Sequence, residues 1–302
     1  MKRSRKTMTV CACINKLADE LEREGRIRTA MTYRSTLKSF LLFTGNEGTT
    51  LADIDRQTVE AYENFLFRKG VVPNTVSFYM RILRAITNKA VDRGYMPLPV
   101  PDPFKHVYTG IAKTTKRAIP LETVKRIRML TLNPYSYTAF ARDMFMFSFY
   151  TRGMSFVDMA HLKRDDIKAG YLIYRRHKTG QLLRVKWEDC MAEIVGRYES
   201  SPPYLLSIIT SLGNDSYKEY QNRLTVVNRH LKTVGRMVGL EQPLSMYVAR
   251  HSWATGALVA NIPIEVISDA MGHESEKTTR IYLASLSTVR VDEANEKLLG
   301  MI

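Results

Sequence analysis

Five prolines between residues 97 and 120 constrain the fold more than any other feature of this 302-residue chain. Proline has no backbone N–H and fixes its own φ, so a proline-rich segment stays extended and does not continue a helix. The basic run K-T-T-K-R lies inside this segment. The chain is therefore expected to form two domains, residues 1–105 and 119–302, joined by a linker at 106–118.

Both expected domains are basic. The formal net charge is +15, of which residues 1–110 carry +7 and the remainder +8. Because phosphates neutralised by lysine and arginine release counterions, such a chain favours a nucleic acid partner. A solvated basic surface without a ligand is the alternative. In the linker, Lys113, Lys116 and Arg117 are expected to lie on the backbone of a DNA duplex.

The cysteines and the start of the chain indicate what is absent. Cys11, Cys13 and Cys190 match no zinc-binding spacing, so no metal or other cofactor is expected. Charged residues such as Lys16 and Asp19 interrupt the apolar run that a signal peptide needs. No apolar run reaches the roughly 18 residues of a membrane-spanning helix. The expected location is the cytoplasm.

The first domain is expected to be helical. Apolar residues recur at helical spacing in four segments, 8–24, 29–43, 50–69 and 74–93. The fourth segment also carries a polar stripe at steps of four, three and four, formed by Ser77, Arg81, Arg84 and Asn88. We interpret this stripe as facing a DNA groove, with an ordinary solvated face as the alternative. Arg34 and Lys38, on the polar side of the second helix, are also expected to contact DNA.

The second domain is expected to be helical with one small hairpin, which makes the whole chain mainly α with a small β-sheet, an α+β fold. Strands are predicted on both sides of the turn H-K-T-G, within residues 171–185, because β-branched and aromatic residues dominate there. The aromatic-rich segment 138–150 is predicted to be a buried core helix. The expected helices are 121–130, 138–150, 156–162, 189–201, 203–212, 221–238, 245–260, 263–271, 275–283 and 288–299.

The stretch from Tyr247 to Tyr282 carries the candidate chemistry. It contains Arg250, the pair Gly272–His273 and the run G-H-E-S-E-K-T-T-R-I-Y, which ends on Tyr282. The order and spacing resemble the catalytic domain of tyrosine recombinases, the family of phage and transposon integrases and DNA invertases. In that family, the run G-H-x(5)-T-x-x-Y ends on the tyrosine that attacks DNA. The first domain resembles the helical, SAM-like core-binding domain of the same family.

The resemblance implies an enzyme that cleaves and rejoins DNA through a 3′-phosphotyrosine, without metal or ATP. Tyr282 would be the nucleophile, although a phenol with a pKa of about 10 needs help to lose its proton. Arg250 would hold phosphate oxygens with its planar fork, and His273 would donate to the same phosphate. Lys178, in the hairpin turn, would protonate the leaving 5′ oxygen. Arg176, on the strand before it, would contact phosphate.

Two positions depart from the family pattern. In the run R-G-M-S-F-V-D that begins at Arg152, Ser155 stands where the family has its first arginine. If this segment is helical, Arg152 shares a face with Ser155, so we hypothesise that Arg152 supplies the missing charge. Tyr247 stands where the family has a histidine, and a phenol can donate a hydrogen bond but cannot take up a proton near neutral pH. Asp158 and Trp253 are expected to be structural supports.

The expected partner is double-stranded DNA with inverted-repeat core sites, bound by a homotetramer. No separate arm domain fits before residue 8, which favours an invertase-type recombinase. The tail helix at 288–299 would pack on a neighbouring protomer or on its own domain. Two alternatives are a catalytically weak or inactive DNA-binding regulator on the same fold and a type IB topoisomerase without site preference. Cleavage of random compared with defined DNA separates these alternatives.

Overall fold

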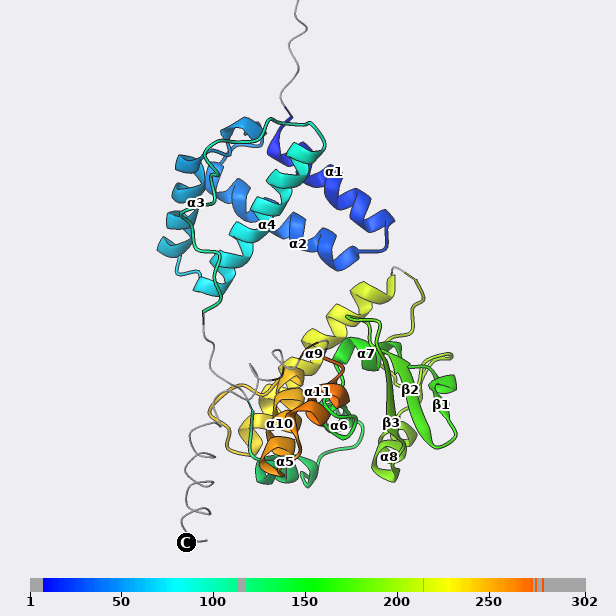
Figure 1. The fold of residues 1–302 in the computed structure, drawn as a ribbon. Coiled ribbons are helices and arrows are strands. Elements are labelled where there is room, and N and C mark those ends of the chain that lie inside the picture. Colours follow the sequence, from blue (N-terminus) through cyan, green and yellow to red (C-terminus); the bar gives the residue numbers. More distant parts are fainter. Residues whose placement is uncertain (1–7, 113–117, 214, 274, 276–278, 280–302) are drawn as a thin grey trace, which may run out of the picture. The chain divides into compact units, whose positions relative to one another are not determined.

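The computed structural model describes residues 8–112, 118–213, 215–273, 275 and 279. The chain divides into two compact units, Met1–Thr114 and Thr115–Ile302, whose junction falls inside the segment expected to be the linker (Figure 1). The described residues are mostly helical and include one three-stranded sheet, so the predicted fold class is confirmed. Among the residues that the structure describes, no helix is both long and apolar enough to cross a membrane.

Unit 1 is built from helices whose starts follow capping chemistry. Thr9 Oγ1 accepts the N–H of Ala12 at 3.1 Å, and Asp55 Oδ1 accepts the N–H of Thr58 at 2.8 Å, so donors left open at each helix start are satisfied. Within residues 8–112 the elements are α1 (Val10–Arg23), α2 (Ile27–Thr44), the 3-10 turn η1 (Leu51–Asp53), α3 (Arg56–Arg68) and α4 (Pro73–Asp92).

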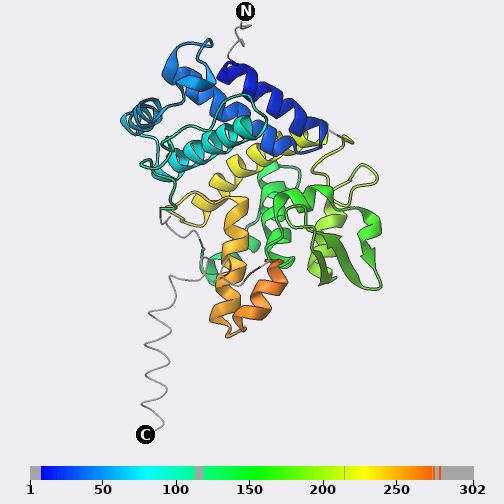
Figure 2. The ribbon, with the colours of Figure 1, turned by 45° about the horizontal axis from the view of Figure 1, so that its top comes forward.

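One core joins the four helices of unit 1. Helices α1 and α2 lie side by side (Figure 2). Tyr62 of α3 packs edge-on against Phe40 of α2, with ring centroids 5.2 Å apart, and its hydroxyl donates to Ser39 Oγ at 2.7 Å. Burial raises the pKa of the Tyr62 hydroxyl above its ordinary value. The four predicted helices are confirmed, except that the third begins at Arg56 because η1 is a separate turn.

Unit 2 combines helices with a small antiparallel sheet in the order β1-β2-β3. The β2–β3 pair is the predicted hairpin, and the short strand β1 was not predicted. The sheet lies at one edge of the unit, next to α7 and α8 (Figure 1). Within residues 118–275 the elements are α5 (Leu121–Arg128), α6 (Tyr137–Tyr150), α7 (Phe156–His161), the 3-10 turn η2 (Arg164–Asp166), β1 (Ile167–Lys168), β2 (Tyr171–Arg175), β3 (Leu182–Lys186), α8 (Asp189–Arg197), α9 (Asp215–Met237), α10 (Met246–Val259) and α11 (Ile264–Met271).

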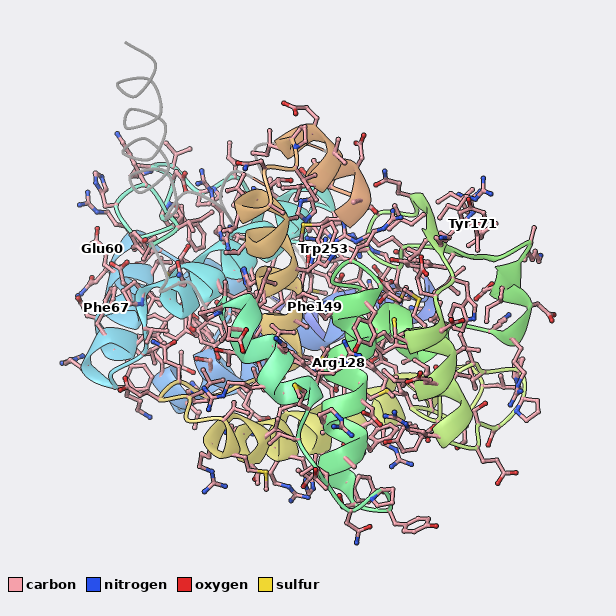
Figure 3. The ribbon with its side chains drawn as sticks, turned by 90° about the horizontal axis from the view of Figure 1, so that it is seen from below. Glu60, Phe67, Arg128, Phe149, Tyr171 and Trp253 are labelled. Atoms are coloured by element: carbon pink, nitrogen blue, oxygen red, sulfur yellow. The ribbon has the colours of Figure 1, made fainter. Side chains whose placement is uncertain are left out.

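The centre of unit 2 is α6, as predicted for a buried core helix. Phe145 and Phe147 are fully buried, and α6 packs against α5, α9 and α10. Figure 3 labels Phe149 on α6 and Arg128 at the end of α5. Arg142 of α6 donates to the carbonyl of Arg128 at 3.2 Å, which satisfies an acceptor left open where α5 ends. Helix α6 therefore holds the neighbouring elements in fixed positions.

The predicted helix at 203–212 is wrong. Tyr204 forms a β-bridge with Lys163, and the N–H of Leu205 donates to the carbonyl of Leu162 at 2.8 Å. The apolar side chains between 204 and 209 are all buried, so this segment has no solvent-facing side and shows no one-sided helical pattern. Tertiary pairing decides the conformation of such a segment, because periodicity does not separate the alternatives. Most of the predicted helix 275–283 and all of 288–299 lie outside the described residues.

Candidate functional site

Arg250, on α10, is the centre of the candidate site. Its side chain is buried, and Nη1 donates to the carbonyl of Gly153 at 2.8 Å while Nη2 donates to the carbonyl of Met271 at 2.7 Å. Nη2 also lies 2.9 Å from His273 Nε2. Arg250 therefore ties the loop after α6 to the end of α11. Its positive charge is not cancelled by these carbonyls, because they are neutral acceptors.

Two glycines allow these elements to approach each other. Gly153 has φ +74°, and a Cβ there would lie 2.7 Å from the Cα of Arg250. Gly272 ends α11 with φ +63°, and a Cβ there would lie 3.0 Å from Leu183 Cδ1 on β3. Both positions combine a left-handed backbone with a close contact, which glycine alone adopts without strain. These requirements explain why glycine stands in the R-G-M sequence at 153 and in the G-H sequence at 272.

His273 is buried beside Arg250 and is neutral near pH 7. Burial, followed by the charges of Arg250, Arg176 and Lys178, lowers the pKa of His273 to about 4. Arginine has only donors, so His273 Nε2 accepts from Arg250, and Nδ1 carries the proton and donates to Thr279 Oγ1 at 2.7 Å. In the described arrangement, His273 therefore has no N–H left to donate the expected hydrogen bond to a phosphate.

Arg176 is the second buried arginine of the site. It directly follows β2, its side chain is 9% exposed, and Nη1 donates to the carbonyl of Gly272. Its backbone N–H donates to Gln181, and its carbonyl accepts from Gly180, both at 2.8 Å. Arg250 and Arg176 therefore reach the consecutive carbonyls of Met271 and Gly272 from two different elements. The sequence indicated a phosphate contact at Arg176 but not its burial.

Lys178 lies in the turn 177–179 and is exposed. Its charge contributes to the lowered pKa of His273, so the lysine lies within electrostatic reach of that ring. In the same turn, Thr179 Oγ1 is buried and has no hydrogen-bond partner among the described residues. The structure thus brings together four of the predicted catalytic or phosphate-contacting residues: Arg176, Lys178, Arg250 and His273.

The helical relation expected between Arg152 and Ser155 is wrong. Arg152 has φ +61° and lies in the loop between α6 and α7, because positive φ values at Arg152 and Gly153 stop the helix. Ser155 is the N-cap of α7, and its hydroxyl donates to Asp158 Oδ2 at 2.6 Å. Arg152 Nη1 instead donates to the carbonyl of Arg184 on β3 at 3.3 Å. Arg152 therefore does not share a helix face with Ser155.

Three arginines nevertheless lie within electrostatic reach of Tyr174 on β2. Burial raises the pKa of the Tyr174 hydroxyl, and the charges of Arg250, Arg176 and Arg152 oppose that rise. For His273, burial lowers the pKa most, and the charges of described residues that add to this effect are those of Arg250, Arg176 and Lys178. Arg176 thus acts on His273 and contacts the neighbouring Gly272, whereas Arg152 contacts the carbonyl of Arg184 on β3.

The remaining predicted catalytic positions lie on or beyond α10. Tyr247 is 52% exposed, and its ring stands edge-on to His251 with centroids 4.4 Å apart. Trp253, labelled in Figure 3, belongs to a small apolar cluster between α10 and α11. Tyr282 lies outside the described residues. Thr279, three positions earlier in the sequence, is buried and bonded to His273.

The polar stripe on α4 is exposed only in part. Arg81, Arg84 and Asn88 are exposed, and Arg84 donates to Asp102 Oδ2 at 2.7 Å. Ser77 is 1% exposed, so its predicted place on a solvent-facing stripe is wrong. Asn74, in the preceding turn, forms two hydrogen bonds with the backbone of Ala112, so a distant segment of the chain lies against this end of the helix.

The other predicted DNA contacts also differ in their surroundings. On α2, Lys38 is exposed, whereas Arg34 donates to Glu22 and, at 2.6 Å, to Asp19. Pairing with two carboxylates cancels the charge that would attract phosphate. The linker residues lie outside the described residues: Lys113, Lys116 and Arg117.

Sequence reasoning missed a basic stripe along α9. Six exposed residues repeat there at steps of four, three, four, three and four, and none is acidic. At a rise of about 1.5 Å per residue the stripe is roughly 27 Å long. The same spacing is visible in the sequence and could have revealed it. The stripe consists of Lys218, Asn222, Thr225, Arg229, Lys232 and Arg236.

Comparison with known proteins places both units in one family. Residues 9–106 match the phage integrase SAM-like domain, and residues 125–288 match the phage integrase family. The tyrosine recombinase XerD of Listeria innocua is 22% identical over 273 residues, which cover 84% of this chain and 86% of that protein. The tyrosine recombinase XerC of Syntrophus aciditrophicus is 25% identical over 282 residues, which cover 88% and 89%.

Solved structures share the fold at low sequence identity. A lambda integrase tetramer bound to a Holliday junction aligns with a TM-score of 0.68 at 16% identity, covering 93% of this chain and 78% of that chain. The Tn1549 transposon integrase in complex with a circular intermediate DNA aligns with a TM-score of 0.61 at 14% identity, covering 95% and 99%.

Proposed function

Since the chain belongs to the phage integrase family, we propose that Arg250, Arg176 and His273 hold the scissile phosphate of its DNA substrate. The chain is a tyrosine-type site-specific recombinase, an enzyme that binds DNA and cleaves and rejoins it. One observation carries the assignment of residues. Two buried arginines, Arg176 directly after β2 and Arg250 on α10, reach consecutive carbonyls at the end of α11, directly beside His273.

Two guanidinium groups suit the reaction because phosphoryl transfer depends on positioning and on stabilising negative charge. Each guanidinium can donate to two non-bridging oxygens in its plane. Bound phosphate would take donors now held by the carbonyls and by His273. Its negative charge would also offset the arginine charges that lower the pKa of His273, so that His273 can donate to the phosphate.

Residues of this chain can supply both the nucleophile and the acid of the chemical step. The Tyr282 oxygen attacks phosphorus, the bond from phosphorus to the 5′ oxygen breaks, and a 3′-phosphotyrosine forms. The phenolic proton leaves to water, and the ammonium of Lys178 gives a proton to the 5′ oxygen. Thr279 supports this assignment, because it is bonded to His273 and precedes Tyr282 by three positions. A later attack by a 5′ hydroxyl rejoins the strand without ATP.

Arg176, rather than Arg152, would replace the arginine missing at Ser155. Arg176 is buried, contacts Gly272 and lies within electrostatic reach of His273. Arg152 is half-buried and donates to a carbonyl of β3. Tyr247, which is exposed on α10, would donate a hydrogen bond to the same phosphate.

The DNA duplex would contact basic residues in both units. The α9 stripe follows one helix for several turns without a carboxylate, as contact with a phosphate backbone requires. Inverted-repeat core sites and a homotetramer on DNA complete the proposal. The tetrameric lambda integrase on a Holliday junction supports that assembly as a precedent for this fold. The other proposed contacts are Lys38, Arg81, Asn88, Lys113, Lys116 and Arg117.

Covalent trapping tests this function. The protein is mixed with nicked duplexes that carry inverted repeats from its own locus, and the products are separated on a denaturing gel. The proposal expects a protein–DNA band with wild type and no band with Tyr282→Phe. Tight binding by both proteins without a band would favour a DNA-binding regulator. Equal cleavage of random and repeat-containing DNA would favour a topoisomerase.

A further inference from the structure

Ser155, at the position where the family pattern has an arginine, is the N-cap of helix α7 and forms a closed pair with Asp158. The Ser155 hydroxyl donates to Asp158 Oδ2 at 2.6 Å and accepts the N–H of Asp158 at 3.4 Å. Its only proton is therefore used inside the protein. A hydroxyl engaged in this way fixes the rotamer of the Asp158 carboxylate.

The second oxygen of Asp158 reaches the hairpin turn. Oδ1 accepts the backbone N–H of His177 at 2.7 Å, and the Asp158 side chain is only 5% exposed. A buried carboxylate bonded to a backbone amide forms a strong, directional contact. This amide immediately precedes Lys178. The first turn of α7 therefore holds the backbone from which the lysine side chain starts.

Other contacts fix the same turn from different sides. The ring of His161, at the end of α7, stacks on the ring of His177 with centroids 5.6 Å apart and planes 13° apart. Arg176, the residue before the turn, donates from its side chain to the carbonyl of Gly272, and Gly180 follows the turn with φ +70°. Lys178 itself is exposed at the tip. The turn is thus anchored on both sides while the lysine remains accessible.

We propose that Asp158, oriented by Ser155, is a positioning residue that places Lys178 for proton transfer to the leaving 5′ oxygen. The inference rests on the proposed function, in which Lys178 is that acid. Proton transfer requires the donor within hydrogen-bond distance of the leaving oxygen, and a displacement of about 1 Å costs on the order of 10²-fold in rate. Because the lysine side chain is long and flexible, only the backbone of the turn fixes the point from which its ammonium approaches the leaving oxygen. The serine that replaces the family arginine therefore supports the acid and leaves the phosphate to other residues.

A leaving group that needs no acid tests this role. In a 5′-bridging phosphorothiolate substrate the leaving atom is sulfur, and a thiolate departs without the proton that an alkoxide requires. We compare cleavage of the oxygen and sulfur substrates by wild type, Asp158→Ala, Asp158→Asn, Ser155→Ala and Lys178→Ala. DNA affinity and thermal melting of each variant report whether it folds. Asp158→Asn retains an oxygen that can accept from His177.

The expected pattern is a selective loss. Asp158→Ala should cleave the oxygen substrate about 10²-fold more slowly and the sulfur substrate at nearly the wild-type rate, as should Lys178→Ala. Asp158→Asn should be intermediate, and Ser155→Ala should show a smaller loss that the sulfur substrate also restores. Equal slowing of folded Asp158→Ala and Asp158→Asn on both substrates, or no slowing on either, would overturn the proposal. Absence of cleavage by wild type on both substrates would overturn the proposed function itself.

Discussion

Two arginines of unit 2 and two arginines of unit 1 make opposite kinds of hydrogen bond. In unit 2, Arg176 and Arg250 are 9% and 6% exposed and donate to backbone carbonyls. In unit 1, the side chains of Arg34 and Arg84 are 38% and 45% exposed and donate to carboxylates. Carbonyls orient a guanidinium and leave its charge in place, whereas carboxylates cancel it.

The energetic consequences differ in the same direction. An exposed ion pair contributes about 0–1 kcal/mol, so the pairs in unit 1 are inexpensive to form or to lose. Burying an arginine against neutral acceptors costs more, because the charge loses its hydration. In the proposed function, the phosphate of the DNA substrate is the anion that these two arginines would meet beside His273. Burial and the type of acceptor therefore distinguish the arginines that we propose to hold phosphate from other arginines of the chain.

Removing a buried arginine is expected to have the largest effect. Arg250→Ala and Arg176→Ala should each slow strand cleavage by about 10²- to 10³-fold, because a lost donor to the developing charge costs about that much. Arg176→Lys should be intermediate, since it retains the charge but loses the fork. Single-turnover cleavage of a nicked substrate measures these rates.

The matched controls are surface arginines. Arg84→Ala and Arg34→Ala should leave single-turnover cleavage at saturating protein close to wild type. Arg152→Ala should also cost less than Arg176→Ala. If Arg176→Ala cleaves as well as Arg84→Ala, or if Arg152→Ala causes the larger loss, then Arg176 is not the arginine that stabilises the phosphate charge.

The histidine between the buried arginines gives a pH dependence of stability. The pKa of His273 is lowered from 6.5 to about 4 in the folded chain, so the unfolded chain binds more protons between these values. His273 therefore stabilises the fold fully above pH 6.5, and about 3 kcal/mol of that contribution is lost as the pH falls toward 4. Denaturant unfolding across this range measures the loss. His273→Gln, which does not titrate, should show a flatter curve, and identical curves for both proteins would contradict the account.

Single lysines of the α9 stripe are expected to have a moderate effect on binding. Lys232→Ala should weaken DNA binding on all sequences and reduce the slope of log affinity against log salt by about 1, because one phosphate contact is lost. Lys186→Ala is the control, since Lys186 lies on β3 and its ammonium pairs with Glu188 at 3.4 Å. Binding isotherms at several salt concentrations distinguish the two lysines. An unchanged slope for Lys232→Ala would remove α9 from the DNA surface.

The smallest effect is expected when a paired arginine of unit 1 is released. Asp102→Asn removes the carboxylate that Arg84 contacts, so Arg84 regains a charge that phosphate can attract. Affinity for DNA should rise by no more than about fivefold, as follows for an exposed pair worth up to about 1 kcal/mol. The double variant with Arg84→Ala should abolish the gain. A gain that persists in the double variant would mean that Asp102 repels DNA independently of Arg84.

Sequence alone predicted most helices and the Arg250–His273 spacing, because both follow from short-range periodicity and from one continuous motif. It did not predict that Arg176, and not Arg152, is the second arginine beside the Gly272–His273 pair. The positive φ of Arg152 turns this side chain toward β3, and that turn depends on the close approach of Gly153 to α10. The burial of Ser77 and the irregular path of 203–212 likewise depend on contacts with distant segments, which no local pattern contains.

The most direct test of the central claim replaces one non-bridging oxygen of the scissile phosphate with a methyl group. This change removes the negative charge that the buried arginines are proposed to stabilise. Relative to the ordinary phosphate, at least one methylphosphonate diastereomer should restore cleavage by Arg176→Ala, while Arg84→Ala should follow wild type on both substrates. An equal loss for Arg176→Ala on the charged and neutral substrates would contradict a role for this arginine in charge stabilisation.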